Sequence, residues 1–340
     1  MSTVLMLRIV LGVALVSALF GAAYGYVAHG ALLLGFGLGA VFGALFPALE
    51  FLFKGEAGAR LRRQPFLVCF GMRAGAYVVL IVAIEVAGVW LAFGSAGIGG
   101  AVVVDLAFAL LLSILGNLAF ATADLLGPGV LFAFAAGRYH RPRPEERALL
   151  FIDLCGSTSK AERLGEARFL AFLDSFIADV SRDIVENGGE IHKYVGDEII
   201  ATWRLRPGRS DAGVARAYFA ARDRLASRRD AYEREFGETA EFRAALHAGV
   251  VAVGEIGLFK KEIALIGDSM NTAARMLDAC RALDRPALAS REFVERLGPL
   301  PDSVEADPIA PLPLRGKAEP LELVALERRQ TERIAVEDVV

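Results

Sequence analysis

The sequence has few of the residues that build disulfide frameworks and soft-metal sites. It contains three cysteines and four histidines, and the cysteines Cys69, Cys155 and Cys280 lack the spacing of a zinc ligand set or a disulfide framework. Reduced thiols, as in a cytosolic protein, fit this pattern. Basic residues are not in excess, because the formal net charge is −3. This balance argues against a general nucleic-acid-binding protein. No internal repeat is visible, so a site built from two similar halves would require two copies of the chain.

Charged side chains are also scarce before residue 137, where Leu, Val, Ala, Phe and Gly dominate. A soluble domain cannot bury that much apolar surface. Four segments are long enough to cross a bilayer as helices, and they span residues 4–26, 31–53, 66–93 and 100–123. We therefore predict a four-helix transmembrane domain over residues 1–124.

The basic residues between these segments predict the orientation. The loops near 27–30 and 94–99 contain no Lys or Arg, whereas the basic residues gather in the second loop and after the last segment: Lys54, Arg60, Arg62, Arg63, Arg138, Arg141 and Arg143. Positively charged loops stay on the cytoplasmic side. We expect a multi-pass protein of the inner (cell) membrane, with both termini and the soluble domain in the cytoplasm and the lipid bilayer as a partner.

Four ionisable residues interrupt the apolar segments: Glu50, Arg73, Glu85 and Asp105. Such charges are costly in a membrane and often mark a ligand or ion site. Two interpretations remain open. The membrane domain receives a signal through them, or Arg73 reaches the interface while Glu85 and Asp105 pair within the bundle or dimer.

A short connection follows the membrane segments. Gly127-Pro128-Gly129 is expected to break the fourth helix, and the apolar remainder to residue 136 is expected to lie along the interface. We assign residues 125–145 to this interfacial segment and linker, 146–327 to a cytoplasmic domain and 328–340 to a C-terminal tail.

The cytoplasmic domain alternates strand and helix patterns. A short apolar run at 148–152 predicts a buried strand, and a helix is expected over 159–187, ending at Asn187-Gly188-Gly189. The further expected elements are two strands within 190–203 that turn at 195–197, a charged helix over 210–236, strands at 242–253 and 262–266, and a helix from Ser269.

Two aspartates stand at the ends of expected strands. Asp153 ends the first strand, and Asp197 lies in the hairpin turn of Lys193-Tyr-Val-Gly-Asp-Glu198. If these strands are neighbours, both carboxylates meet at one edge. Carboxylate oxygens together with substrate phosphates are the ligands that Mg²⁺ prefers. Each aspartate alone is more often a capping or turn residue.

Further polar residues complete a pattern suited to phosphates. Gly156, Ser157 and Thr158 open a helix, whose free N–H groups favour phosphate. Asn271 and Arg275 are four residues apart and share one helix face. Near the C-terminus, Lys317 follows Arg315-Gly316 and adds a cation.

These motifs together resemble the class III nucleotide cyclase catalytic domain, and the arrangement is similar to the bacterial membrane-anchored subgroup. The resemblance covers about residues 146–327 and implies an α+β ferredoxin-like fold. It implies a phosphorus–oxygen lyase: an adenylate cyclase that converts ATP to 3′,5′-cyclic AMP and pyrophosphate by two-metal, in-line attack of the ribose 3′-hydroxyl. It also implies a homodimer with active sites at its interface.

The resemblance also assigns roles to residues. Asp153, Asp197 and the Ile152 carbonyl match the metal ligands for two Mg²⁺ or Mn²⁺ ions in each active site. The substrate residues are Lys193 for the base, Gly156, Ser157 and Thr158 at the phosphate-binding helix start, Asn271 for the ribose, Arg275 for the transition state and Lys317 for the triphosphate. Because the metal ligands come from one subunit and Lys193, Asn271, Arg275 and Lys317 from the other, two equivalent sites are expected in a C2 dimer.

The sequence departs from the family at Ala264. Adenylate cyclases of the family have an Asp or Thr there as a second base-reading group. Guanylate cyclases usually place an acidic residue where Lys193 stands, so Lys193 favours ATP. The alternatives are a guanylate cyclase that makes cyclic GMP and a catalytically silent nucleotide-binding receptor.

Two other functions fit the sequence less well. A diguanylate cyclase would need a second Gly at Val195 and Phe at Ile199. A transporter is disfavoured because the short loops contain no pair of broken helices.

Overall fold

A computed structural model describes residues 3–54, 58, 64–93, 106–107, 110–111, 113–118, 122, 137–205, 212–297, 304–313 and 320–328. The chain separates into two compact units, residues 1–131 and residues 132–340. Each unit is described by itself.

The first unit contains three long apolar helices: α1 (Thr3–His29), α2 (Leu32–Lys54) and α4 (Phe66–Phe93). These three agree with the first three predicted membrane segments, and each is long and apolar enough to cross a bilayer. The fourth predicted segment, 100–123, falls largely outside the described residues, as do the interfacial segment 125–136 and Asp105. Within the described part of the chain, three membrane-spanning candidates are therefore present rather than the four expected.

Glycines allow α1 and α2 to approach closely. A Cβ atom added to Gly21 would collide with the backbone of Gly35, and one added to Gly35 would collide with Gly21. Small residues at such crossings bring helix backbones together, which is a common way to pack helices in lipid.

A buried polar cluster joins α2 to α4 in the first unit. Glu50 accepts hydrogen bonds from the Arg73 guanidinium and from the Tyr77 hydroxyl, and Glu50 and Tyr77 are both buried. The Tyr77 ring stacks on Phe46 with ring centroids 4.2 Å apart. Arg73 is thus paired with Glu50 between α2 and α4, and the expectation that it reaches the membrane interface stays a prediction.

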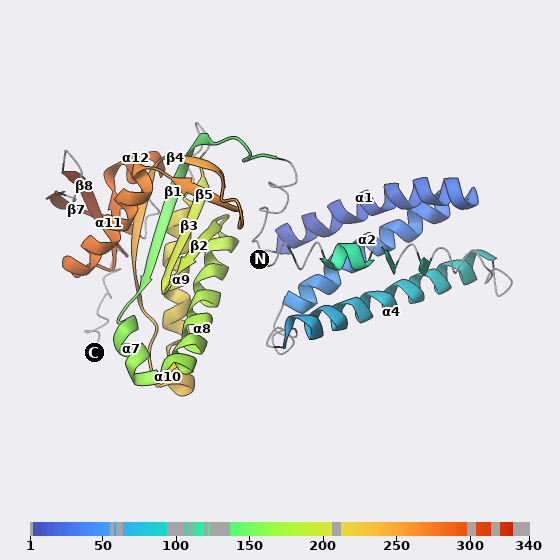
Figure 1. The fold of residues 1–340 in the computed structure, drawn as a ribbon, viewed down its shortest axis with the longest axis horizontal. Coiled ribbons are helices and arrows are strands. Elements are labelled where there is room, and N and C mark those ends of the chain that lie inside the picture. The colour runs from blue at the N-terminus through green and yellow to red at the C-terminus, as the bar shows by residue number, and fades with distance from the viewer. Residues whose placement is uncertain are drawn as a thin grey trace, which may run out of the picture. The chain divides into compact units, whose positions relative to one another are not determined.

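The second unit is a mixed sheet with helices on both faces (Figure 1). The strand order is β2-β3-β1-β4-β6-β8-β7, and β5 pairs with β4. The strands are β1 (Arg143–Leu154), β2 (Glu190–Val195), β3 (Glu198–Arg204), β4 (Phe242–Ile256), β5 (Glu262–Ile266), β6 (Ala287–Ser290), β7 (Val304–Leu312) and β8 (Leu321–Arg328). Among these strands, only β4 and β6 pair in parallel.

Two apolar cores lie on the two faces of this sheet. On one face, α8 (Glu166–Glu186), α9 (Gly213–Ser227), α10 (Arg229–Phe236) and α12 (Arg291–Leu297) pack through residues that include Phe172, Phe176, Tyr218 and Trp203. On the other face, α11 (Asp268–Ala282) packs through Ala273, Met276 and Cys280. The strand alternation sends successive residues of β1 to opposite cores.

Several predicted boundaries require correction. The single helix expected over 159–187 is two helices, α7 (Ser157–Leu164) and α8, because Gly165 between them has φ 75°. The helix expected over 210–236 is also two, α9 and α10, which meet at Arg228. β1 begins at Arg143, before the expected start of the domain at residue 146. The predicted strands at 190–203, 242–253 and 262–266 are confirmed.

Candidate active site

Asp153 and Asp197 lie together at one edge of the sheet. β1 and β3 pair antiparallel, with Asp153 opposite Glu198, and Asp197 lies in the turn before β3. Gly196 supplies the positive φ of 64° that this turn requires. The adjacency that the two-metal prediction depended on is confirmed by this register.

Burial and neighbouring carboxylates raise the pKa values of two acidic side chains at this edge, Asp153 and Glu198. Burial, and then repulsion from Asp197, raises the pKa of Asp153. Burial raises the pKa of Glu198 to about 7, with further contributions from Asp153, Asp197 and Asp278. Uncompensated carboxylates this close favour a proton or another cation between them.

An arginine partly neutralises this edge. The Arg281 guanidinium near the end of α11 donates to Asp153 Oδ2 at 2.8 Å, and the Arg281 side chain is 66% exposed against 16% for Asp153. A cation that binds Asp153 must therefore compete with Arg281. Because the Arg281 side chain is exposed and exposed ion pairs are weak, Arg281 can move away from Asp153 at little cost in free energy.

The start of α7 lies directly after Asp153 in the chain. Gly156 has φ 67° and precedes the first helical residue, Ser157. Lys160 Nζ donates to the Cys155 carbonyl at 2.9 Å, so a cation stands beside the N-terminal N–H groups of the helix. Both features favour a bound phosphate.

Lys193 meets a residue from a distant strand. β4 curves over the end of the sheet, so that β5 approaches β2 (Figure 1). Lys193 Nζ lies 3.1 Å from Glu262 Oε1, with side chains 49% and 38% exposed. Ala264 stands two residues after Glu262 on β5 and is buried. The position at which the resemblance places a second base-reading group is therefore apolar here, and a carboxylate lies two residues before it on β5.

Asn271 lies apart from the two aspartates within one chain, and Arg275 lies between Asn271 and that edge along α11. Both are on the helix face that also carries Asp278 and Arg281, since these residues follow the helical repeat. Asn271 precedes Arg281 by ten residues, which is about 15 Å along the axis. Among the described residues, Arg275 forms no hydrogen bond or ion pair, and Asn271 is exposed. Lys317 lies outside the described residues.

The structure also adds residues that the sequence patterns did not single out. Glu198, Asp278 and Arg281 surround the aspartate pair, and Glu262 accompanies Lys193. The register of a β-hairpin could have drawn attention to Glu198, because it follows Asp197 directly. The roles of Arg281 and Glu262 depend on contacts between distant segments, for which the sequence contains no local signal.

The donor set at this edge fits a hard divalent cation that is shared with a substrate. Asp153, Asp197 and the Ile152 carbonyl supply only oxygen atoms, and no group of three or more His, Cys, Asp or Glu side chains in the described part of the chain encloses a metal position. Mg²⁺ typically takes one or two protein carboxylates and completes its shell with phosphates and water.

Comparison with known proteins finds adenylate cyclases among the relatives of this chain. No family model matches the sequence. Adenylate cyclase 2 of Rhizobium meliloti is 36% identical over 203 residues, which are 60% of this chain and 56% of that protein. The adenylate cyclase of Anabaena cylindrica is 30% identical over 133 residues, which are 38% of this chain and 26% of that protein. The chain thus spans about half, or less, of the length of these curated relatives.

Solved structures share the fold of the second unit. The adenylyl cyclase CyaB from P. aeruginosa superposes with a TM-score of 0.50 at 19% identity, covering 56% of this chain and 98% of that chain. The second unit has the class III nucleotide cyclase fold. A bacterial light-regulated adenylyl cyclase superposes with a TM-score of 0.55 at 18% identity, covering 64% of each chain. The resemblance found in the sequence motifs is therefore confirmed, and the cyclase fold positions Asp153 and Asp197 together.

Proposed function

We propose that this protein is a membrane-anchored adenylate cyclase that converts ATP to 3′,5′-cyclic AMP and pyrophosphate. The observation that carries the proposal is the juxtaposition of Asp153 and Asp197 at the sheet edge beside the α7 N-terminus. The 36% identity to an adenylate cyclase over 203 residues supports it. The three apolar helices support the membrane anchor.

The protein's own residues would prepare the substrate for ring closure. Asp153, Asp197 and the Ile152 carbonyl would hold Mg²⁺ or Mn²⁺, two ions in each site, and the N–H groups from Gly156 to Thr158 would bind phosphate oxygens. When bound, the divalent ions supply charge neutralisation and acidify the ribose 3′-hydroxyl. Because both reacting groups belong to one molecule, rate enhancement then depends chiefly on orientation and electrostatics.

A second subunit would complete each site. Lys193 would bind the base, Asn271 the ribose, Arg275 the developing negative charge and Lys317 the triphosphate. The distance along α11 between Asn271 and the aspartate edge supports contributions from two chains. We propose a C2 homodimer with two equivalent sites, a cytoplasmic catalytic domain over 146–327, and both termini in the cytoplasm.

The direct test is product formation by the purified full-length protein. ATP and GTP are supplied separately with Mg²⁺ or Mn²⁺, and products are identified by mass spectrometry. We expect cyclic AMP from ATP and little cyclic GMP from GTP. Cyclic GMP as the main product would favour the guanylate cyclase alternative, and no product from either would favour a silent nucleotide-binding receptor.

The variant Asp197→Ala tests the site itself. It removes one carboxylate from an exposed turn, so the fold is expected to persist while cyclic AMP formation falls to background. Activity retained at an unchanged thermal unfolding midpoint would contradict the metal-ligand assignment.

A further inference from the structure

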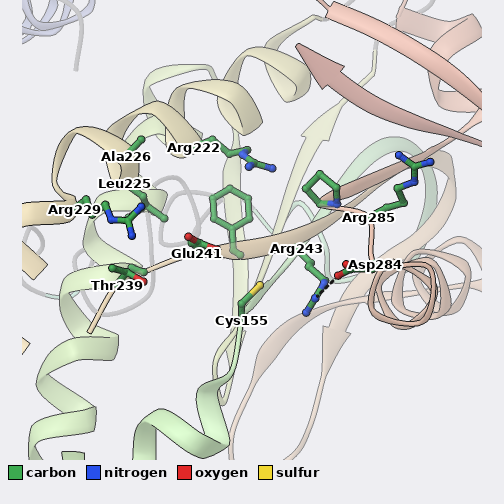
Figure 2. Close-up of a pocket in the computed structure, with 13 residues that line it drawn as sticks. Cys155, Arg222, Leu225, Ala226, Arg229, Thr239, Glu241, Arg243, Asp284 and Arg285 are labelled. Carbon is green, nitrogen blue, oxygen red and sulfur yellow. Dashed lines mark hydrogen bonds and ion pairs between the residues drawn. The ribbon is translucent and has the colours of Figure 1, made fainter. Parts of the chain in front are cut away.

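A second concave site lies at the same end of the sheet as Asp153, and neither Asp153 nor Asp197 is among its lining residues. It is a cavity of about 500 Å³ between α9, the start of β4 and the segment before β6 (Figure 2). Its lining comes from five parts of the second unit: Cys155; Arg222, Leu225 and Ala226; Arg229; Thr239 to Arg243; and Asp284, Arg285 and Pro286.

The lining carries more positive than negative charge. Four arginines face two carboxylates, those of Glu241 and Asp284. Of the arginines, Arg243 pairs with Asp284 at 3.2 Å, Arg285 with Glu327 at 3.0 Å and Arg229 with Glu233 at 3.1 Å. Both side chains are exposed in the Arg285 and Arg229 pairs, whereas Arg243 is half-buried and its partner Asp284 is exposed. An incoming anion can displace exposed carboxylates at small cost.

Arg222 differs from the other three arginines. Its guanidinium donates to the Tyr218 hydroxyl at 3.0 Å and lies over the Tyr218 ring, and among the described residues it forms no ion pair. Tyr218 is buried, so its hydroxyl and ring give the Arg222 guanidinium a fixed contact. In Figure 2 the Arg222 side chain extends from α9 across the opening, towards the side where Arg285 lies. In the part of the chain that the structure describes, the cavity therefore presents a positioned guanidinium that forms no ion pair with a carboxylate.

We propose that this cavity binds a small phosphorylated molecule. A guanidinium presents several N–H donors in a planar fork that matches phosphate oxygens, and Arg222 and Arg285 stand on two sides of the opening (Figure 2). Leu225, Phe242 and Pro286 form an apolar wall beside the arginines. Cavities that bind small molecules combine such a wall with a few convergent polar groups.

The position of the cavity connects it to the aspartate edge. Arg243 is the β4 residue directly opposite Asp153 in the β1–β4 register, and Cys155 in the lining follows Asp153 by two residues. Asp284, which holds Arg243, comes just after α11, the helix whose Arg281 pairs with Asp153. A ligand that competes for Arg243 would therefore change the Arg243–Asp284 contact and, through the end of α11, the contact of Arg281 with Asp153. The inferred site is regulatory, and phosphate binding to it requires no catalytic turnover.

The experiment is a calorimetric titration of inorganic pyrophosphate into the full-length protein with EDTA present. Without divalent cations the active site loses the ions that bind phosphates. Because the N–H groups of α7 and Lys317 still offer phosphate contacts there, the arginine variants identify the share of binding that belongs to the cavity. We expect saturable binding by the parent protein. The double variant Arg222→Gln/Arg285→Gln is expected to weaken binding at least tenfold, and Arg222→Gln alone at least threefold.

The matched control is Arg182→Gln, which removes an exposed arginine on α8 outside the lining and is expected to leave binding unchanged. No saturable binding by the parent protein, or equal binding by parent and Arg222→Gln, would overturn the inference. Failure here would leave cyclic AMP formation intact, whereas failure of the proposed function would leave the EDTA titration unaffected.

Discussion

At the scale of single residues, Lys193 and Glu262 form the contact on which base selection would depend. Ala264 offers no side-chain hydrogen bond, so we predict that Glu262 orients Lys193 towards the base. Replacing Glu262 with Gln removes the charge attraction between Lys193 Nζ and Glu262 Oε1, which lie 3.1 Å apart. An exposed ion pair contributes up to about 1 kcal/mol, which corresponds to roughly a fivefold effect.

The predicted result for Glu262→Gln is a fall of up to about fivefold in the ratio of kcat/KM for ATP to kcat/KM for GTP. Glu322→Gln breaks another exposed ion pair, with Arg291, and serves as the matched control with an unchanged ratio. If the ratio of kcat/KM for ATP to kcat/KM for GTP in Glu262→Gln equals that of Glu322→Gln and of the parent protein, Lys193 reads the base without Glu262.

His192 gives a prediction about pH. Burial, and then repulsion from Lys193, lowers the pKa of His192 from 6.5 to about 4. The unfolded chain therefore binds more protons at this residue than the folded chain between pH 6.5 and about 4. It follows that this histidine's contribution lowers stability as the pH falls through that interval.

Replacing His192 with Gln should reduce this acid sensitivity. We expect the difference in unfolding free energy between pH 7 and pH 4.5 to be smaller in His192→Gln than in the parent protein, as measured by urea unfolding of both proteins. His140, which is exposed, gives the control: His140→Gln should retain the parent's pH dependence. Identical pH dependence in all three proteins would contradict the role assigned to His192.

At the scale of helices and strands, local patterns predicted most of the second unit. Strand alternation and the Gly196 turn identified β2, β3 and the position of Asp197. The spacing of apolar residues could not locate the break between α7 and α8 at Gly165, because apolar residues on both sides of Gly165 face the same core. The break depends on a backbone conformation, φ 75°, that the pattern of side chains does not report.

Contacts between distant segments were not predictable in the same way. The pairing of Glu50 with Arg73 required knowing which faces of α2 and α4 meet, and the contact of Glu262 with Lys193 required the curvature of β4. In both cases the two partners are polar residues whose sequence neighbourhoods are unrelated. The sequence singled out Glu50 and Arg73 as charges within apolar segments, and Lys193 through the resemblance, without identifying their partners; it contained no signal for Glu262.

The Glu50–Arg73 pair gives a prediction at this scale. Removing one partner of a buried ion pair leaves an uncompensated charge, which typically costs about 3–5 kcal/mol. We expect Glu50→Ala to lower the thermal unfolding midpoint of the detergent-solubilised protein clearly. The double variant Glu50→Leu/Arg73→Met should recover most of the loss, because it leaves no buried charge. A single variant as stable as the parent protein would show that Arg73 is neutralised in another way.

At the scale of the whole molecule, the proposed homodimer would distribute one reaction over two chains. Each chain contains Asp153 and Asp197 at the sheet edge, and Asn271 and Arg275 on α11, about 15 Å and about 9 Å before Arg281 along the helix axis. A chain lacking Asp153 should therefore be able to use the aspartates of a partner that lacks Asn271. The Asp153→Ala and Asn271→Ala proteins are each expected to be inactive alone.

Co-expression of the two inactive chains, with different affinity tags, tests this arrangement. Random pairing makes half of the dimers mixed, and each mixed dimer contains one intact site of two, so about a quarter of the parent activity is expected in the unfractionated mixture. Purification through both tags isolates the mixed dimers, where the expected activity rises to about half. Cyclic AMP formation is measured in both samples. Mixed dimers that form but remain inactive would require all catalytic groups to act within one chain, and the 15 Å separation on α11 would then have to be closed by a change within the second unit.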